Sequence, residues 1–81
     1  MATKPQHKAR YKRLPGLLRR WREEAGLTQR DIAQKVNLSH VAVHKNETAE
    51  RRVDVAEFCD WATACGVDPV DAIAEFVGRA K

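Results

Sequence analysis

The sequence predicts an all-α fold, a compact orthogonal bundle of five short helices with a flexible basic arm at its N-terminus. Three observations favour this fold. Apolar residues recur at helical spacing in several separate stretches. Helix-capping residues or glycine stand at the ends of these stretches, and no run of alternating β-branched residues indicates a strand. The chain has 81 residues, which suits one domain with a small core.

Residues 1–12 are expected to form the basic arm, and residues 13–81 are expected to form the domain. The arm lacks apolar periodicity, and Pro5 disfavours a helix within it. We therefore expect the arm to be disordered in the free protein. Five cationic residues lie in the arm or directly after it: Lys4, Lys8, Arg10, Lys12 and Arg13.

The first helix is expected over residues 13–25. Pro15 fits its first turn, where the missing N–H does no harm, and Gly26 supplies a left-handed residue that ends it. The apolar residues of this helix share one face: Leu14, Leu17, Leu18, Trp21 and Ala25. This face is expected to pack into the core, so Trp21 is interpreted as a core residue and not as a stacking platform.

The second helix is expected over residues 29–36. Thr28 is a good N-cap, and Asp31 three residues later makes an imperfect capping box. Asn37 follows the helix and is the best non-glycine choice for a left-handed turn residue. The inward-facing residues are Ile32, Ala33 and Val36, and Ala33 is small enough to lie where two helices cross.

The third helix is expected over residues 40–46. Leu38 anchors the turn before it, and Ser39 caps its start. Four side chains are expected to face outward from this helix: His40, Val41, His44 and Lys45. A charged loop over residues 47–52 follows.

The fourth helix is expected over residues 54–65, closed by Gly66, and the fifth begins with Asp68 as N-cap and Pro69 in the first turn. The fourth presents an apolar stripe flanked by a further core residue, Trp61: Val55, Phe58, Cys59, Ala62 and Cys65. The buried side of the fifth is expected to consist of Val70, Ile73, Ala74 and Val77.

The net charge of +4 conceals an uneven distribution along the chain. Residues 1–22 contain eight basic residues and no acid, whereas acidic residues predominate from Val53 onward. Such asymmetry is an electrostatic argument for a nucleic-acid partner. The basic arm either wraps around a duplex or enters its minor groove, or it is only a solubilising tail.

The stretch from Thr28 to Thr48 therefore predicts a helix-turn-helix, whose second helix is held clear of the body and fits a DNA major groove. Several segments in and before this stretch resemble the phage-repressor helix-turn-helix family (Cro/XRE-type, lambda-repressor-like): Arg22–Gln29, Ile32-Ala33, Leu38-Ser39, Val43 and Glu47. Residues 51–69 resemble the family's continuation. The resemblance covers roughly residues 14–77.

This resemblance implies a small transcriptional regulator or phage-type repressor that binds double-stranded DNA sequence-specifically through the third helix. It also implies a homodimer on a palindromic operator, for which the fifth helix with Phe76 and Val77 is the candidate surface. The base-reading positions are His40, Val41 and Lys45. The DNA-backbone positions are Gln29, Ser39 and Thr48, to which we add His44. The family's structural salt bridge matches Arg22 and Glu47, which would tie the first helix to the end of the third.

Two positions depart from the family's pattern. Asn46 stands where the family usually places an apolar core residue. A buried amide there must find a partner, because lacking one costs about 1–3 kcal/mol. Ala49 stands where glycine is common after the third helix, so the loop that follows is expected to differ.

Two pairs of residues leave alternatives open. Arg51 and Arg52 are either DNA-backbone contacts or partners for the nearby acids Glu47 and Glu50. His40 and His44 are spaced by four residues, as some metal ligands are, but no HExxH pattern and no third ligand accompany them. We interpret both histidines as groove-facing, and expect no metal and no cofactor.

Other functional classes find little support. Cys59 and Cys65 lie six residues apart in one helix, roughly 9 Å at 1.5 Å rise per residue, which is too far for a disulfide. No nucleophile–base constellation or phosphate-cradling glycine loop indicates an enzyme. No apolar run suggests a membrane span or signal peptide, so a cytoplasmic, nucleoid-associated protein is expected. The alternative function is a protein-interaction module on the same fold, such as an antitoxin-like partner-binding protein.

Overall fold

The computed structural model describes residues 5–78, and within that range the chain forms five α-helices and no strand. In chain order they are α1 (Pro5–Glu24), α2 (Gln29–Val36), α3 (His40–Glu47), α4 (Val55–Ala64) and α5 (Pro69–Phe76). The all-α bundle predicted from the sequence is confirmed. None of the helices described is long and apolar enough to cross a membrane.

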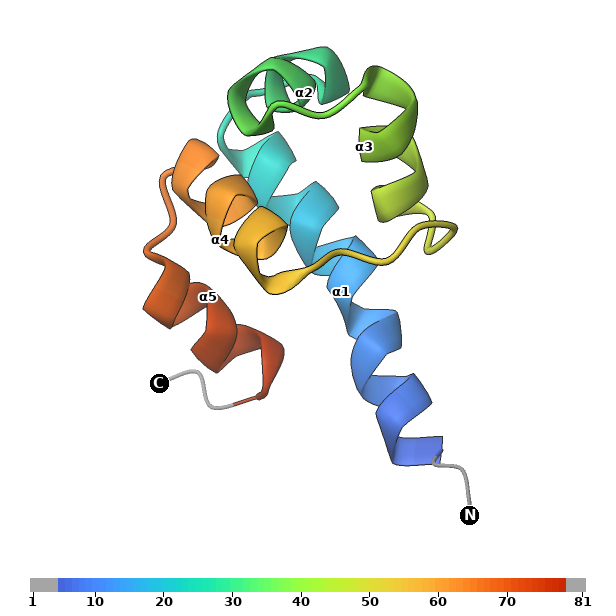
Figure 1. Cartoon of the computed structure of the whole chain (residues 1–81). Helices are drawn as coiled ribbons and strands as arrows, with labels where there is room; N and C mark the ends of the chain where they lie inside the picture. The colour runs from blue at the N-terminus through green and yellow to red at the C-terminus, as the bar shows by residue number, and fades with distance from the viewer. Residues whose placement is uncertain (1–4, 79–81) are drawn as a thin grey trace.

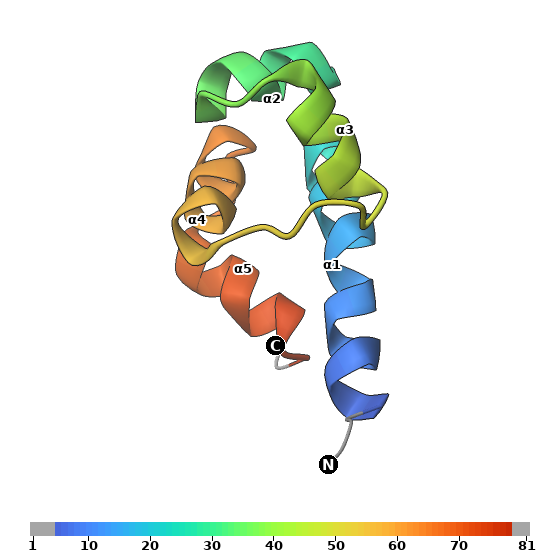
Figure 2. The ribbon, with the colours of Figure 1, turned by 45° about the vertical axis from the view of Figure 1, so that its right-hand side comes forward.

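Helix α1 organises the bundle. Its N-terminal turns extend beyond the other helices, which gather around its C-terminal half (Figure 1). Helix α2 lies across that end of α1, α3 runs beside α1 on one side, and α4 and α5 lie on the other (Figure 2). The helix pair α2–α3 therefore stands at one end of the molecule, away from α5.

The first helix begins earlier than the sequence predicted, at Pro5 and not near residue 13. Pro15 consequently lies inside α1 and not in its first turn. The added turns are supported by Tyr11, whose hydroxyl accepts a hydrogen bond from the Val53 N–H at 3.3 Å. The Arg52 guanidinium also lies 5.4 Å from the centre of the Tyr11 ring. Contacts so distant in the chain leave no periodic signal in the sequence of the arm itself.

The core is centred on Trp61, which the sequence placed at the edge of the α4 stripe. Its side chain is fully buried, and its indole N–H donates to the Leu18 carbonyl oxygen at 3.1 Å. Phe58 and Ala62 are buried beside it, whereas Val55, a predicted member of the stripe, is 73% exposed. The satisfied indole N–H allows the largest side chain of α4 to lie inside. The prediction that Trp21 and Trp61 are core residues is confirmed.

Helix α5 is rotated relative to the sequence prediction. Ala72 is its fully buried residue, whereas Val70 and Ile73, predicted to be buried, are 76% and 42% exposed. The rotation turns the Glu75 side chain toward Trp21 of α1. It also packs the Phe76 ring against that of Phe58, with the ring centroids 6.3 Å apart. A carboxylate on the inner side of α5 is invisible to a count of apolar residues.

Glu75 joins α5 to α1 through three residues. Its carboxylate accepts a hydrogen bond from the Trp21 indole N–H at 3.2 Å and forms an ion pair with Arg20. Its backbone carbonyl oxygen accepts from Arg13 Nη2 at 3.1 Å, close to the C-terminal end of α5, where a cation is favourable. Arg13, a residue expected to serve DNA binding with the basic arm, is therefore engaged within the fold.

These bonds are expected to make stability depend on pH. The Arg20 guanidinium, and secondly the Trp21 indole, hold the pKa of the Glu75 carboxyl below its ordinary value of 4.5. A lowered folded-state pKa gives a stabilisation that is complete above the ordinary pKa and is lost as pH falls through the folded-state value. We expect Glu75→Gln to lower the free energy of unfolding by about 1 kcal/mol at pH 7 and to have a smaller effect at pH 3.

Urea denaturation at the two pH values measures this difference. Glu24→Gln is the matched control, because Glu24 pairs with the same Arg20 at 3.6 Å while its own side chain is largely exposed. An exposed pair contributes at most a few tenths of a kcal/mol. Equal effects of the two substitutions at pH 7 would contradict the role assigned to Glu75.

Candidate nucleic-acid interface

The helix pair α2–α3 is built from local hydrogen bonds. Thr28 Oγ1 accepts from the Asp31 N–H at 3.1 Å, and the Asp31 carboxylate accepts from the Thr28 N–H at 2.8 Å, a reciprocal capping box. These bonds from Thr28 also lower the pKa of Asp31. Asn37 adopts the left-handed conformation with φ of 60°, and the Leu38 N–H donates to the Ala33 carbonyl oxygen at 2.9 Å. The boundaries and the turn residue predicted for α2 are confirmed.

Helix α3 has a buried inner face and an exposed outer face. Ser39 caps its start by accepting from the Ala42 N–H at 3.0 Å. Val43 and Asn46 are buried, whereas four side chains are exposed on the opposite side: His40, Val41, His44 and Lys45. An exposed face of this width on a helix at the edge of the molecule can enter a groove without moving the bundle (Figure 2).

Arg22 and Glu47 form a buried ion pair between α1 and the end of α3. Arg22 Nε lies 2.6 Å from Glu47 Oε2, and Nη2 lies 3.1 Å from Oε1. The remaining terminal nitrogen, Nη1, donates to the Leu27 carbonyl oxygen at 2.9 Å. The side chains are only 12% and 3% exposed. The guanidinium therefore fixes both the loop before α2 and the carboxylate at the end of α3.

Gln29, a residue expected to contact the DNA backbone, has its amide turned toward this pair. Gln29 Nε2 donates to Glu47 Oε1 at 3.0 Å and lies 3.5 Å from His44 Nδ1. The amide therefore links the start of α2 to two residues in the last turns of α3. Its inward orientation is not visible in the sequence, because it depends on how the two helices cross.

The other expected DNA-backbone residues differ in how free their side chains are. The Thr48 hydroxyl lies within hydrogen-bonding distance of the carbonyl oxygens of His44 and Lys45, at 3.2 and 3.3 Å, and of the Glu50 carboxylate at 3.0 Å. It therefore caps α3. Arg52 is exposed, with its guanidinium over the Tyr11 ring. A cation held on an aromatic ring in this way still presents its charge to solvent.

Arg51 is part of a polar network around Asn46. Its guanidinium donates to Glu57 through both terminal nitrogens, at 2.9 and 3.0 Å, and to Asn46 Oδ1 at 3.1 Å. The acids expected as alternative partners, Glu47 and Glu50, are not the ones it contacts. Glu57 lies in the first turn of α4, too far along the chain for the loop sequence to suggest it.

The polar residue that departs from the family's pattern is thus accommodated only in part. Asn46 is 1% exposed, and its Oδ1 accepts from Arg51, whereas Nδ2 has no hydrogen-bond partner among the residues described. At the other departure, Ala49 adopts the left-handed backbone conformation that glycine would adopt more easily, with φ of 67°. This conformation costs a non-glycine residue about 1–2 kcal/mol. Both positions lie at the junction between α3 and the loop.

The structure describes only part of the expected basic arm. Lys4 lies outside the described residues, as do the side chains of Lys8 and Arg10, although the backbone of residues 5–10 belongs to α1. Lys12 is exposed on α1. The contribution of the arm to binding stays a prediction.

Two residues of α2 were missed by sequence reasoning. Arg30 and Gln34 are exposed and border an open hollow of about 420 Å³ together with His40 at the start of α3. Their spacing of four residues, on the side of α2 opposite Ile32 and Val36, is a signal that was available in the sequence. They extend the exposed polar surface from α3 onto α2.

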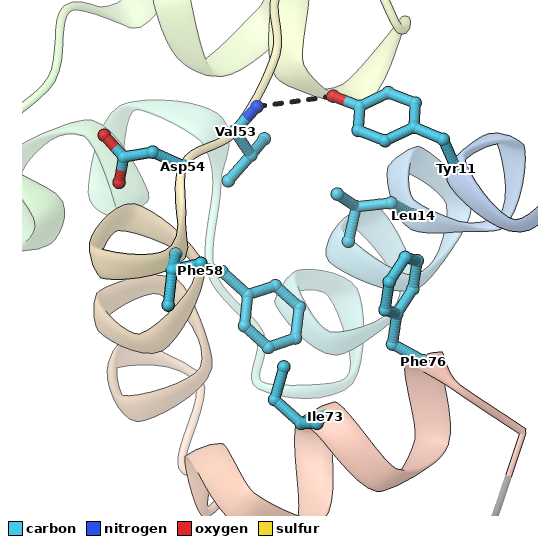
Figure 3. Close-up of a pocket in the computed structure, with 8 residues that line it drawn as sticks. Tyr11, Leu14, Val53, Asp54, Phe58, Ile73 and Phe76 are labelled. Carbon is cyan, nitrogen blue, oxygen red and sulfur yellow. Dashed lines mark hydrogen bonds between the residues drawn. The ribbon is translucent and has the colours of Figure 1, made fainter. Parts of the chain in front are cut away.

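A second, apolar hollow of about 190 Å³ lies between α1, α4 and α5. Tyr11 and Leu14 line it from α1, Phe58 from α4, and Ile73 and Phe76 from α5 (Figure 3). None of its lining residues belongs to α2 or α3, and none of them is cationic. Nothing in its lining resembles a site for a nucleic acid.

Comparisons with known proteins decide the family. The model of the helix-turn-helix domain family matches residues 13–76. The chain belongs to the XRE-type helix-turn-helix family. Among solved structures, an XRE-family like protein from Pseudomonas syringae pv. tomato str. DC3000 is 37% identical, with a TM-score of 0.82 over 93% of this chain and 92% of that one. No curated protein matches the chain.

Membership of the XRE-type helix-turn-helix family makes the chain a DNA-binding regulator in general terms. The family is regulatory and not enzymatic. The family also supports double-stranded DNA as the partner. In this XRE-type domain, no group of three metal-ligating side chains occurs within residues 5–78.

Proposed function

We propose that this XRE-type protein binds double-stranded DNA sequence-specifically, as a small transcriptional regulator or repressor, with α3 as the recognition helix in the major groove. The observation that carries the proposal is the outer face of α3, where an apolar residue, Val41, is 59% exposed between cationic or titratable neighbours. A valine on such a face suits the methyl group of thymine, and Lys45 suits guanine O6 and N7. His40 is the third base-reading residue.

DNA-backbone contacts would surround this face. Ser39, His44, Thr48 and Arg52 are the proposed side chains, joined by Arg30 and Gln34 from α2. Gln29 begins α2, so its backbone N–H points to the same side as the helix N-terminus, which favours a phosphate. The bonds of Arg51 to Glu57 and Asn46 favour a role in positioning the loop over a direct phosphate contact.

We further infer a homodimer on a palindromic operator, in the cytoplasm. The candidate contact surface is the exposed apolar part of α4 and α5, consisting of Val55, Val70 and Ile73. Phe76, the earlier candidate, is partly buried against the core. Operator half-sites about one helical turn apart, roughly 34 Å, would fit two recognition helices related by a two-fold axis.

Selection of bound sequences from a random duplex pool tests the function. The expected outcome is an enriched palindrome whose affinity falls steeply with salt, since each neutralised phosphate releases counterions. The half-site spacing reports the dimer geometry in the same experiment. No enrichment, together with no salt-dependent binding to random duplex, would favour the protein-interaction module instead.

Lys45→Ala is expected to weaken binding to the selected operator about tenfold and to relax the preference at one base pair. Lys35→Ala removes the same charge from α2, beside Asp60 and Thr63 of α4, away from the outer face of α3. It should change affinity little. Electrophoretic mobility shifts with the operator and with single-base variants measure both. Equal losses for the two variants, without altered base preference, would contradict base reading by Lys45.

A further inference from the structure

Tyr11 is the residue at which the N-terminal part of α1 meets the loop between α3 and α4 (Figure 3). Its hydroxyl accepts a hydrogen bond from the Val53 N–H at 3.3 Å. The Arg52 guanidinium lies over its ring, 5.4 Å from the ring centre. One side chain thus contacts two consecutive loop residues in two different ways. The family model matches residues 13–76, so the family's pattern assigns no role to Tyr11.

The other end of this loop is bonded to the last turn of α3. The N–H groups of Glu50 and Arg51 donate to the Lys45 carbonyl oxygen at 2.9 and 3.2 Å. Arg52 therefore lies between a residue whose backbone is bonded to α3 and a residue whose backbone is bonded to α1. A helix that enters the major groove, which is about 12 Å wide, has phosphates on both sides. Arg52 is thus a cation beside the end of the proposed recognition helix.

The Arg52 guanidinium keeps its hydrogen-bond donors for an anion. The two acids nearest to it in the chain are engaged elsewhere. The Glu50 carboxylate lies 3.0 Å from the Thr48 hydroxyl. Asp54 accepts from the Glu57 N–H at 2.8 Å. Within residues 5–78, none of the hydrogen bonds and ion pairs described involves the Arg52 side chain. Arginine can contact an aromatic ring and also bind a phosphate through two N–H groups.

We propose that Tyr11 is a positioning residue for the phosphate contact of Arg52: its hydroxyl holds the loop backbone and its ring holds the guanidinium before DNA binds. The inference rests on the proposed function, in which Arg52 contacts the DNA backbone. A side chain that is ordered in advance loses less conformational entropy on binding, which raises affinity. Tyr11 needs no contact with DNA to have this effect.

A double-mutant cycle on DNA affinity tests the coupling. Affinity for the selected operator is measured for the wild type, Tyr11→Leu, Arg52→Ala and the double variant, at a temperature where circular dichroism shows all four to be folded. We expect Tyr11→Leu to weaken binding about three- to tenfold, the effect of ordering one long side chain. In the Arg52→Ala background the same change should have no further effect.

Two more variants separate positioning from a general effect on the fold. Tyr11→Phe keeps the ring and removes only the hydroxyl, so it should weaken binding less than Tyr11→Leu, and again only when Arg52 is present. Lys35→Ala is the matched control charge, since Lys35 lines a different surface beside Asp60 and Thr63. Tyr11→Leu should weaken binding equally in the wild type and in Lys35→Ala. An equal loss with and without Arg52 would overturn the proposal, because Tyr11 would then only stabilise the fold.

NMR of the free protein separates this inference from the proposed function. In the wild type, the heteronuclear NOE of Arg52 Nε should show an ordered side chain, and the Val53 amide hydrogen should exchange slowly. Tyr11→Leu should lower the NOE and speed the exchange. A disordered Arg52 Nε in the wild type would overturn this inference even if DNA binds. Failure of the wild type to bind any duplex would instead overturn the proposed function, and with it the role of Tyr11.

Discussion

Replacing Arg22 by alanine is expected to lower the free energy of unfolding by about 3–5 kcal/mol, the usual effect of removing one partner from a buried ion pair. The substitution leaves the Glu47 carboxylate, with a side chain only 3% exposed, without its guanidinium. It also leaves the Leu27 carbonyl oxygen without its donor at 2.9 Å. The free energy of unfolding of a small domain is only about 5–15 kcal/mol in total. The melting temperature of the variant should therefore lie far below that of the wild type.

Arg19→Ala is the matched control for this prediction. Arg19 lies on the same helix and pairs with Glu23 at 3.0 Å, but both side chains are more than half exposed. Its removal should change the free energy of unfolding by a few tenths of a kcal/mol. Similar melting temperatures for Arg22→Ala and Arg19→Ala would contradict the buried role. A double variant, Arg22→Met with Glu47→Leu, should recover much of the loss, because no charge is then left unpaired.

Replacing Arg51 by alanine is expected to lower the free energy of unfolding by about 2 kcal/mol. The variant loses two bonds to Glu57 and leaves the buried amide of Asn46 without a partner at either polar atom. The Arg51 guanidinium also holds the pKa of the Glu57 carboxyl below its ordinary value, so that pKa should rise in the variant. Urea denaturation and NMR titration of the Glu57 carboxyl measure the two effects.

Arg52→Ala removes the same charge one residue later. Arg52 contacts the Tyr11 ring from the surface, which contributes about 0.5–1 kcal/mol at an exposed site. We expect this variant to be the more stable of the two but to bind DNA more weakly, because its charge is free to face a phosphate. A larger stability loss in Arg52→Ala than in Arg51→Ala would contradict the assignment of the network to Arg51.

Sequence reasoning succeeded where structure is determined within a few residues. Thr28, Asp31 and Asn37 act through neighbours three to five residues away, and the boundaries of α2 were accordingly predicted without error. The family pattern also joined Arg22 to Glu47, two residues that lie 25 positions apart and form an ion pair in the structure.

Sequence reasoning failed where contacts between residues far apart in the chain determine the structure. The early start of α1 depends on Tyr11 meeting Val53, and the rotation of α5 depends on Glu75 meeting Trp21. A periodicity count treats Glu75 as a solvent-exposed residue, because it does not include partners 54 positions away. The inward turn of the Gln29 amide has the same origin, since it requires the crossing of α2 and α3.

The division of α3 into two faces has a consequence for how such a domain changes over evolutionary time. None of the side-chain hydrogen bonds described within residues 5–78 involves the side chains of His40, Val41 or Lys45. Exposed positions of this kind usually tolerate substitution within about 0.5 kcal/mol. The three positions can therefore vary without threatening the fold, whose bonds come from the inner face. With these three positions as the base-reading residues that we propose, a lineage carrying this domain can acquire new operators by point substitution while its stability stays nearly constant.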